Sequence, residues 1–305
     1  MSGAGEPSPG DRVVLRRRLP AGSSHLMTDV LGILESTDPL RVRTGAGTVV
    51  QVAAADVVAL KTVPARPVST RAVRALEQAA ALAWPGTEHA WLDDWLLRAG
   101  GGFTGRANSC VPLGPMPADG IARVLAWYAE RGLPARFTQP DRLAVDLPGW
   151  TLGERSRVLT AASEAVAGAG VDVRADPDED WFAACRYRGA TLPPAAAAVL
   201  RSVVDGELGF ARITRGSQVV AVARGALTSA PDGTRWVGLT AVAVAPEARR
   251  QGLGARLCAG LTAWGTERGA QQVYVQVAED NTAARALYAG AGFTDHHGYG
   301  YAHQP

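Results

Sequence analysis

The segment AVAVAPEARRQGLGARL constrains the fold of this 305-residue chain more than any other. The small apolar residues that precede Pro246 indicate a strand, and a glycine-rich turn containing Gly252 and Gly254 follows. After the turn, apolar residues recur at the spacing of an amphipathic helix, at Leu253, Leu257, Leu261 and Trp264. The order strand, glycine-rich turn, helix indicates a site for an anion at the start of the helix.

The physical reason lies in the backbone at the helix N-terminus. The first N–H groups have no partner within the helix, the helix dipole favours negative charge, and glycine lets the backbone approach phosphate oxygens closely. Arg249 and Arg250 add guanidinium groups that form charge-assisted hydrogen bonds. The turn matches neither GxxxxGK[ST] nor GxGxxG, so ATP and NAD are poor candidates for the anion.

The form R-x-x-G-x-G, with Arg249, Gly252 and Gly254, resembles the motif of the GNAT superfamily of N-acetyltransferases. In that superfamily the loop holds the pyrophosphate of acetyl-CoA, and the strand before it binds pantetheine through its backbone. The resemblance therefore implies acetyl-CoA as co-substrate. It assigns cofactor binding to Val242, Ala243, Val244, Arg249, Arg250, Gln251, Gly252, Leu253, Gly254 and Ala255.

A second element, YVQVAEDNTAARALYAGAGF, resembles the strand and helix that complete the acetyl-CoA site in the same superfamily. By this resemblance Tyr288 binds the cofactor and is the general acid that protonates the leaving thiolate; the alternative is a core aromatic residue. Asn281 either contacts the cofactor or caps the helix that begins near Thr282, a position where asparagine is favoured on its own account.

The general base is not evident. Some relatives carry a glutamate on the strand five residues before the asparagine, whereas this chain has Gln276, whose amide cannot take up a proton. Glu207, Glu279 and Asp280 are carboxylates near the site in sequence. A water relay to a more remote group is an equally open alternative.

The whole chain looks like a bacterial group in which an SH3-like barrel and a diverged GNAT-like half precede an active GNAT domain. We therefore expect an α/β (α+β) chain whose last domain has the GNAT fold with a mixed central sheet. The expected parts are a loose tail over 1–10, the SH3-like β-barrel over 11–63, a diverged α/β domain over 68–171 and the catalytic domain over 172–305. The acidic stretch VDVRADPDED marks the last boundary.

Local patterns predict the elements of the two later parts. In the middle part we expect helices over 71–84 and 117–132 and strands over 90–100, 103–113, 134–140 and 143–150. On a strand over 90–100, Trp91 and Trp95 would share one face and belong to the core. Cys258, among apolar neighbours on the helix after the loop, is expected in the core and not as a nucleophile.

Charge and composition exclude several other functions. A formal net charge of +2 is too small to imply a nucleic-acid partner. Three dispersed cysteines indicate neither disulfides nor zinc, and His296, His297 and His303 lack metal-binding spacing, so no metal is expected. No apolar run is long enough for a membrane span and no signal peptide precedes the chain, which favours the cytoplasm.

The expected function is direct transfer of an acetyl group from acetyl-CoA to a primary amine of a small molecule, a peptide or a protein. A non-catalytic protein that senses acetyl-CoA or acts as a scaffold is the alternative, and the missing base favours it. A nucleic-acid-associated protein is a third reading, which the low net charge opposes. The sequence does not identify the acceptor or the oligomeric state.

Overall fold

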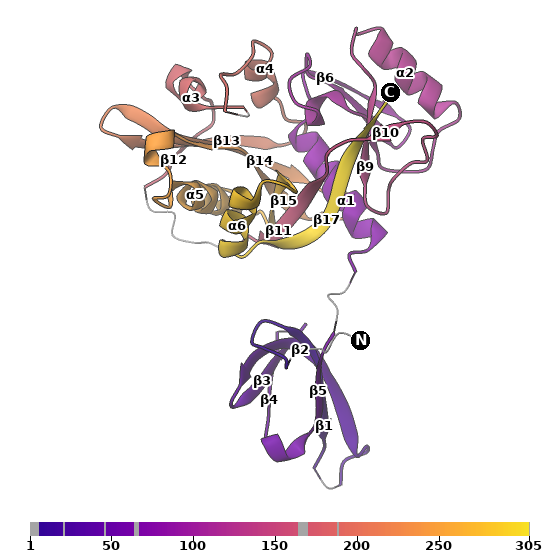
Figure 1. Ribbon diagram of the computed structural model, residues 1–305, viewed down its shortest axis with the longest axis vertical. Helices are drawn as coiled ribbons and strands as arrows, with labels where there is room; N and C mark the ends of the chain where they lie inside the picture. Colours follow the sequence, from indigo (N-terminus) through magenta and orange to yellow (C-terminus); the bar gives the residue numbers. More distant parts are fainter. Residues whose placement is uncertain are drawn as a thin grey trace. The chain divides into compact units, whose positions relative to one another are not determined.

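The computed structural model describes residues 6–20, 22–45, 47–63, 67–163, 170–187 and 189–304. Residues 1–5 of the expected tail, and residues 64–66 between the barrel and the next part, lie outside these ranges. The chain forms two compact units, Met1–Pro67 and Val68–Pro305, each described below by itself (Figure 1).

The first unit is a five-stranded antiparallel sheet, and it confirms that the chain begins with a small β domain, whose bounds of 11–63 stay a prediction. Its strands are β1 (Arg12–Arg18), β2 (Met27–Thr37), β3 (Leu40–Thr44), β4 (Val49–Val52) and β5 (Val57–Thr62), in the order β4-β3-β2-β1-β5. A short 3-10 turn, η1 (Ala54–Asp56), connects β4 to β5. Alternate residues of these strands form the unit's own core around Val13, Leu15, Leu34 and Val42.

The second unit is built on a nine-stranded sheet of mixed direction. The order is β10-β17-β11-β16-β15-β14-β13-β12, with β9 paired to β17, and the pair β15·β16 is parallel. The strands are β9 (Arg136–Pro140), β10 (Thr151–Leu152), β11 (Ser156–Ala162), β12 (Asp172–Arg174), β13 (Glu207–Arg215), β14 (Gln218–Ser229), β15 (Arg235–Val244), β16 (Gln272–Ala278) and β17 (Thr294–His303). The mixed central sheet expected for the last domain is confirmed.

Strand β11, which the sequence patterns did not reveal, lies inside this sheet. It pairs antiparallel with β16 on one side and with β17 on the other. The expected domain boundary at 171/172 falls between β11 and β12, yet strands from both sides of it share one sheet. The boundary therefore stays a prediction, and the acidic stretch around it forms β12 and a helix rather than a linker.

Helices cover both faces of the sheet. Figure 1 shows α5 (Leu253–Glu267) and α6 (Thr282–Gly290) on one side and α3 (Glu179–Ala184) and α4 (Ala196–Leu200) on the other. Helix α1 (Thr70–Ala83) is capped by Ser69, whose side chain accepts a hydrogen bond from Ala72 N. It packs on the same face as α4, since buried Arg224 of β14 donates to the backbone oxygens of both Ala83 and Leu200.

The predicted strand over 90–100 is a hairpin of two strands, β6 (Glu88–Leu92) and β7 (Trp95–Ala99). The turn at Asp93 and Asp94 separates the two tryptophans, so Trp95 is fully buried whereas Trp91 is 47% exposed. The expectation that both belong to the core is wrong for Trp91, because the turn reverses the alternation of faces.

The segments on either side of helix α2 (Gly120–Ala129) follow the expectations only in part. The segment 103–113 forms a 3-10 turn, η2 (Arg106–Asn108), and the two-residue strand β8 (Val111–Pro112). The strand expected over 143–150 is wrong, because no strand forms there and Val145 N donates to the Gln139 side chain instead of to a neighbouring strand. Its apolar residues still pack in the core around Phe137, which explains the misleading alternation.

Within the described ranges, no helix is long and apolar enough to span a membrane. In the same part of the chain, no three His, Cys, Asp or Glu side chains lie close enough together to hold a metal ion. Cys110, Cys185 and Cys258 are all buried thiols.

Candidate active site

The site begins at an irregularity in β15. Arg224 of β14 pairs with Thr240, but Val222 pairs with Ala243, so β15 has a bulge at Ala241 and Val242. Ala241 has a positive φ of 52°. On the other side of β15, the parallel pairing with β16 ends at Leu239 and Val275, although both strands continue. Among the residues that the structure describes, β15 therefore has no partner strand on its β16 side beyond Leu239.

The peptide groups on this open edge can bind a ligand. Ala245 N donates to Val220 O of β14. Because N–H directions alternate along a strand, the N–H group of Val244 points to the opposite edge, away from β14. The structure thus gives the backbone of Val242–Val244 a free edge, as the resemblance to the GNAT strand requires.

The glycine-rich loop follows directly. A short 3-10 turn, η3 (Pro246–Ala248), leads to Arg249, whose Nε donates to Val244 O at 3.2 Å. Gly252 caps helix α5 with φ 74°, a left-handed conformation that glycine adopts without strain. The first hydrogen bond from α5 back to this cap is Arg256 N to Gly252 O, at 3.0 Å. The N–H groups of Leu253 and Gly254 precede it and have no acceptor within the helix.

Helix α6 brings the second predicted element to the same place. Asn281 caps this helix, since its Oδ1 accepts from Ala284 N at 3.1 Å. Tyr288, 7% exposed, packs its ring 5.7 Å from that of Phe293. Burial raises the pKa of Tyr288 above its ordinary value, so the neutral phenol is the form present at neutral pH.

A cavity of about 1190 Å³ joins these elements. Ten of the twelve residues predicted to form the site line it: Val242, Ala243, Val244, Arg249, Arg250, Gly252, Leu253, Gly254, Asn281 and Tyr288. Gln251 and Ala255 do not. Gln251 is exposed, and its side chain accepts a hydrogen bond from Arg215. The assignment of Gln251 and Ala255 to cofactor binding stays a prediction, because neither residue lines the cavity.

Sequence reasoning missed the opposite wall. Asp180, Ala183 and Ala184 of α3, Arg186 just after it, and residues 217–219 at the β13–β14 turn also line the cavity. The signal was present in the acidic stretch, because Asp178 is a helix cap whose Oδ1 accepts from Trp181 N at 3.0 Å. The prolines and carboxylates around it favoured a domain boundary instead.

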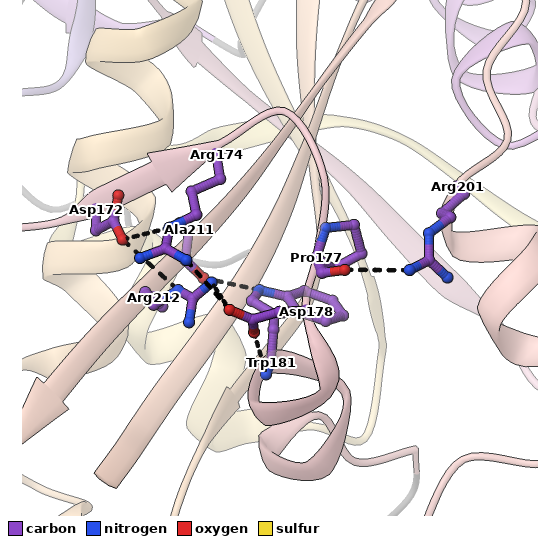
Figure 2. A network of polar contacts seen from close by, with 8 residues as sticks. All are labelled: Asp172, Arg174, Pro177, Asp178, Trp181, Arg201, Ala211 and Arg212. Carbon is purple, nitrogen blue, oxygen red and sulfur yellow. Dashed lines mark hydrogen bonds and ion pairs between the residues drawn. The ribbon is translucent and has the colours of Figure 1, made fainter. Parts of the chain in front are cut away.

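Figure 2 shows how α3 is fixed on the sheet. Asp178 Oδ2 accepts from buried Arg212 of β13 at 2.5 Å and from Arg174 of β12 at 3.1 Å. Trp181 Nε1 donates to Ala211 O at 2.9 Å, and Arg201 donates to Pro177 O. These contacts hold the helix that forms the cavity wall.

The carboxylates considered as bases lie elsewhere. Glu207 forms ion pairs with Arg235 and Arg268, and Glu279 lies 3.8 Å from both Arg155 and Arg157. Neither they nor Asp280 line the cavity, whose acidic lining residues are Asp180 and Glu247. Cys258 is in the core behind the loop, and burial raises its pKa to about 12, which excludes a thiolate nucleophile at neutral pH.

The mixed sheet, the break between β15 and β16 and the loop before α5 define an acetyltransferase of the GNAT superfamily. Residues 70–302 match the family model described as "Probable histone acetyltransferase Rv0428c C-terminal". Residues 7–61 match the model described as "Rv0428c N-terminal Sm-like domain", which fits the small barrel. The chain belongs to this family of two-part acetyltransferases.

Individual relatives agree with this assignment. The chain is 44% identical over 297 residues to "Probable histone acetyltransferase Rv0428c" of Mycobacterium tuberculosis, covering 95% of this chain and 94% of that protein. It is 26% identical to "Uncharacterized N-acetyltransferase YobR" of Bacillus subtilis, covering 74% and 97%. A solved GCN5-related N-acetyltransferase from Kribbella flavida covers 79% of this chain and 97% of its own at a TM-score of 0.50 and 17% identity, which supports the fold alone.

Proposed function

We propose that this acetyltransferase takes its acetyl group from acetyl-CoA and transfers it directly to a primary amine within a ternary complex. The observation that carries the proposal is the lining of one cavity. It combines the helix N-terminus of α5 and two arginines with the open edge of β15 and with Tyr288. A ligand that carries both an anionic group and a reactive acyl group matches this lining.

The donors around the N-terminus of α5 support binding of the diphosphate of coenzyme A. The N–H groups of Leu253 and Gly254, together with the guanidinium groups of Arg249 and Arg250, supply hydrogen-bond donors and positive charge. The remaining predicted contacts of the loop, Gln251, Gly252 and Ala255, belong to the same proposal. Asn281 would face the ligand while its side chain also caps α6.

The open edge of β15 and the hydroxyl group of Tyr288 support acyl transfer. The pantetheine arm would pair with the backbone of Val242, Ala243 and Val244, and an N–H group on that edge would stabilise the oxyanion as the amine attacks the thioester carbonyl. The Tyr288 O–H group would then donate its proton to the departing sulfur. Because the amine attacks directly, no covalent acetyl-enzyme is needed, in agreement with the inaccessible thiol of Cys258.

The acceptor is proposed only as a primary amine. The name of the mycobacterial relative adds lysine side chains of histone-like proteins to the small-molecule and peptide amines that deserve testing. Arg186 and Asp180 on the α3 wall place opposite charges beside the cavity and would contact whichever acceptor enters from that side.

The test is a calorimetric titration of the purified protein with acetyl-CoA. We expect micromolar binding in the wild-type protein and at least a tenfold loss in the double variant Arg249→Ala, Gly252→Ala. Arg123→Ala is the matched control, since it removes an exposed arginine of α2 that does not line the cavity.

A second step measures CoA thiol release with a panel of an aminoglycoside, a polyamine, an amino acid and a lysine-containing histone peptide. Release that depends on one amine class supports the proposal and identifies the acceptor. Absence of acetyl-CoA binding in the folded wild-type protein, or binding without release for any amine, would contradict it.

A further inference from the structure

A second, smaller cavity opens beside the α3 wall, and the proposed chemistry does not use it. It has a volume of about 530 Å³ and shares the lining residues Ala183 and Arg186 with the larger cavity described above. Its other lining residues are apolar except for one threonine: Phe182, Thr191, Leu192, Pro193, Pro194 and Ala197. We call it the side pocket. Because the two cavities share part of their walls, a ligand in the larger cavity can extend into the side pocket.

The side pocket and the open edge of β15 rest on the same part of the core. Trp181 of α3 is fully buried there. Phe182 and Leu192 of the side pocket pack against this core cluster, and Ala241 and Ala243 of β15 pack against the same cluster. A group bound in the side pocket therefore lies on the wall next to the strand that would hold the thioester. That is the position from which an acceptor reaches the thioester.

Contacts outside the side pocket fix its walls. The guanidinium carbon of Arg201 lies 4.5 Å from the centre of the Phe182 ring. After α3, the ring of Tyr187 lies 5.1 Å from that of Phe103, which anchors the chain between α3 and α4. Pro193 restricts the backbone further along this connection. A pocket that is formed before the ligand arrives binds at a low cost in conformational entropy, as small-molecule sites commonly do.

The same wall carries two opposite charges. Arg186 lines both cavities and so lies at their junction, and Asp180 lines the larger one. Arg186 donates to the backbone oxygens of Ala183 and Cys185, which holds its side chain at the C-terminal end of α3. Among the residues that the structure describes, Arg186 has no carboxylate partner. Its positive charge is therefore available to a ligand.

We propose that the acceptor is an α-amino acid with an apolar side chain, bound with its carboxylate at Arg186 and its side chain in the side pocket. The inference rests on the proposed function and names the acceptor of that same site. In an α-amino acid the three groups are attached to one carbon atom. A carboxylate held at the junction thus directs the side chain into the side pocket and the amino group into the larger cavity. There Asp180 attracts the ammonium form, which attacks the thioester after it has lost a proton.

Other amines and acyl groups match these walls less well. Polyamines and aminoglycosides bring no apolar group for the side pocket, and Arg186 repels their additional ammonium groups. A long acyl chain on the donor would fill the side pocket, but it would cover the charge of Arg186 without pairing it, which costs free energy. An apolar amino acid satisfies the apolar walls and the arginine together.

The experiment measures kcat/KM of the full chain with acetyl-CoA and three amines: phenylalanine, glycine and phenethylamine. Phenylalanine should exceed glycine by about tenfold or more, because its ring leaves water for an apolar pocket. It should exceed phenethylamine, which lacks the carboxylate, by about tenfold. In Arg186→Gln the ratio of phenylalanine to phenethylamine should fall close to one, because the variant no longer has a charge that distinguishes the two amines.

A bulky substitution tests the side pocket itself. Ala197→Phe fills it from α4, and Ala198→Phe is the matched control, since Ala198 is exposed on the same helix and lines neither cavity. We expect kcat/KM for phenylalanine to fall about tenfold in Ala197→Phe, with glycine and the affinity for acetyl-CoA within twofold of wild type. The control should match wild type throughout. Thr191→Phe, at an exposed lining residue, replaces Ala197→Phe if circular dichroism shows that the latter does not fold.

The possible failures are distinguishable. A wild-type protein that acetylates a lysine peptide or a polyamine but no apolar amino acid keeps the proposed function and overturns the side pocket as an acceptor site. If Ala197→Phe lowers the rate with octanoyl-CoA as donor but not the rate with phenylalanine as acceptor, the side pocket holds the acyl chain and the proposal is overturned. A protein that binds acetyl-CoA but acetylates no amine overturns the proposed function, and the acceptor assignment with it.

Discussion

Single residues at the loop and on α6 carry the chemistry because their backbone and burial are unusual. Gly252 has a φ of 74° that a side chain would strain by about 1 kcal/mol, and it starts the helix whose N–H groups face the cavity. Tyr288 is buried on α6 yet lines the same cavity, so its hydroxyl group is protonated and shielded from bulk water.

Replacement of Tyr288 by phenylalanine tests its role as a proton donor. The ring keeps its contact with Phe293, so the fold and the affinity for acetyl-CoA should change less than twofold. The variant lacks the O–H group, and we expect kcat to fall by about ten- to a hundredfold. Calorimetry gives the affinity and steady-state kinetics the turnover. Equal losses in both would mean that Tyr288 serves binding or packing.

Secondary-structure elements are held by arginines that cross from one element to another. Arg212 fixes α3 through Asp178. Arg224 of β14 donates hydrogen bonds to the C-terminal ends of two helices, at Ala83 O of α1 and Leu200 O of α4. A cation at a helix C-terminus also complements the helix dipole. The walls of the cavity therefore depend on side-chain contacts made away from it.

Replacement of Asp178 by asparagine tests the contribution of the Arg212–Asp178 contact, because the effect of the change on stability should depend on pH. The hydrogen bond from Arg212, followed by that from Trp181 N, lowers the pKa of Asp178 below its ordinary value of about 4. A pKa lowered by folding stabilises the protein above the unfolded-state value, and this contribution is lost as pH falls through the folded-state value. Asparagine preserves the helix cap but removes the charge.

We therefore expect a lower urea midpoint for Asp178→Asn at pH 7, and a difference from wild type that shrinks below about pH 4. Intrinsic tryptophan fluorescence provides the measurement. Asp119→Asn is the control, because Asp119 occupies the cap position of α2 without a side-chain cap bond. An equal difference at pH 7 and pH 3 would show that the charge of Asp178 is not the cause.

Arg224→Leu should destabilise the second unit strongly. The change removes the Arg224 donor from the buried backbone oxygens of Ala83 and Leu200 and from the partly buried oxygen of Ser202. We expect a loss of about 3 kcal/mol in the free energy of unfolding and a melting temperature lower by roughly 10 °C. Calorimetric melting measures both. Arg224→Lys should recover part of the loss, and a Leu variant within 1 kcal/mol of wild type would contradict the argument.

At the scale of the whole molecule, the chain consists of two units with separate cores. The core of the barrel contains only residues of the first unit, and the cores of the second unit begin at Ala75. The residues that line the cavity all fall between Asp180 and Tyr288.

A chain that begins at Val68 should therefore fold by itself. We expect it to keep the melting transition of the second unit and an affinity for acetyl-CoA within twofold of the full chain. Circular dichroism melting and calorimetric titration check the two statements. Loss of acetyl-CoA binding by the folded shorter chain would show that the barrel contributes to the site.

Much of the fold and part of the site follow from local sequence patterns. The five barrel strands, the helix with its Ser69 cap, the Arg249–Gly254 loop and the α6 cap at Asn281 all depend on residues within a few positions of one another. Periodicity, capping and glycine conformation act at that range, so the sequence alone predicts these elements. The GNAT class of the second unit came from the resemblance of its loop motif to that of the superfamily.

Only the tertiary structure decided the contacts between distant segments. The insertion of β11 between β16 and β17, the α3 wall fixed by Arg212, and the buried contact between Glu77 of α1 and His297 of β17 across 220 residues depend on which strands and helices become neighbours. That choice follows from the burial of whole faces and the closure of long loops, which no local pattern specifies. For the same reason the hairpin turn between Trp91 and Trp95, which leaves Trp91 exposed, became evident only in the folded chain.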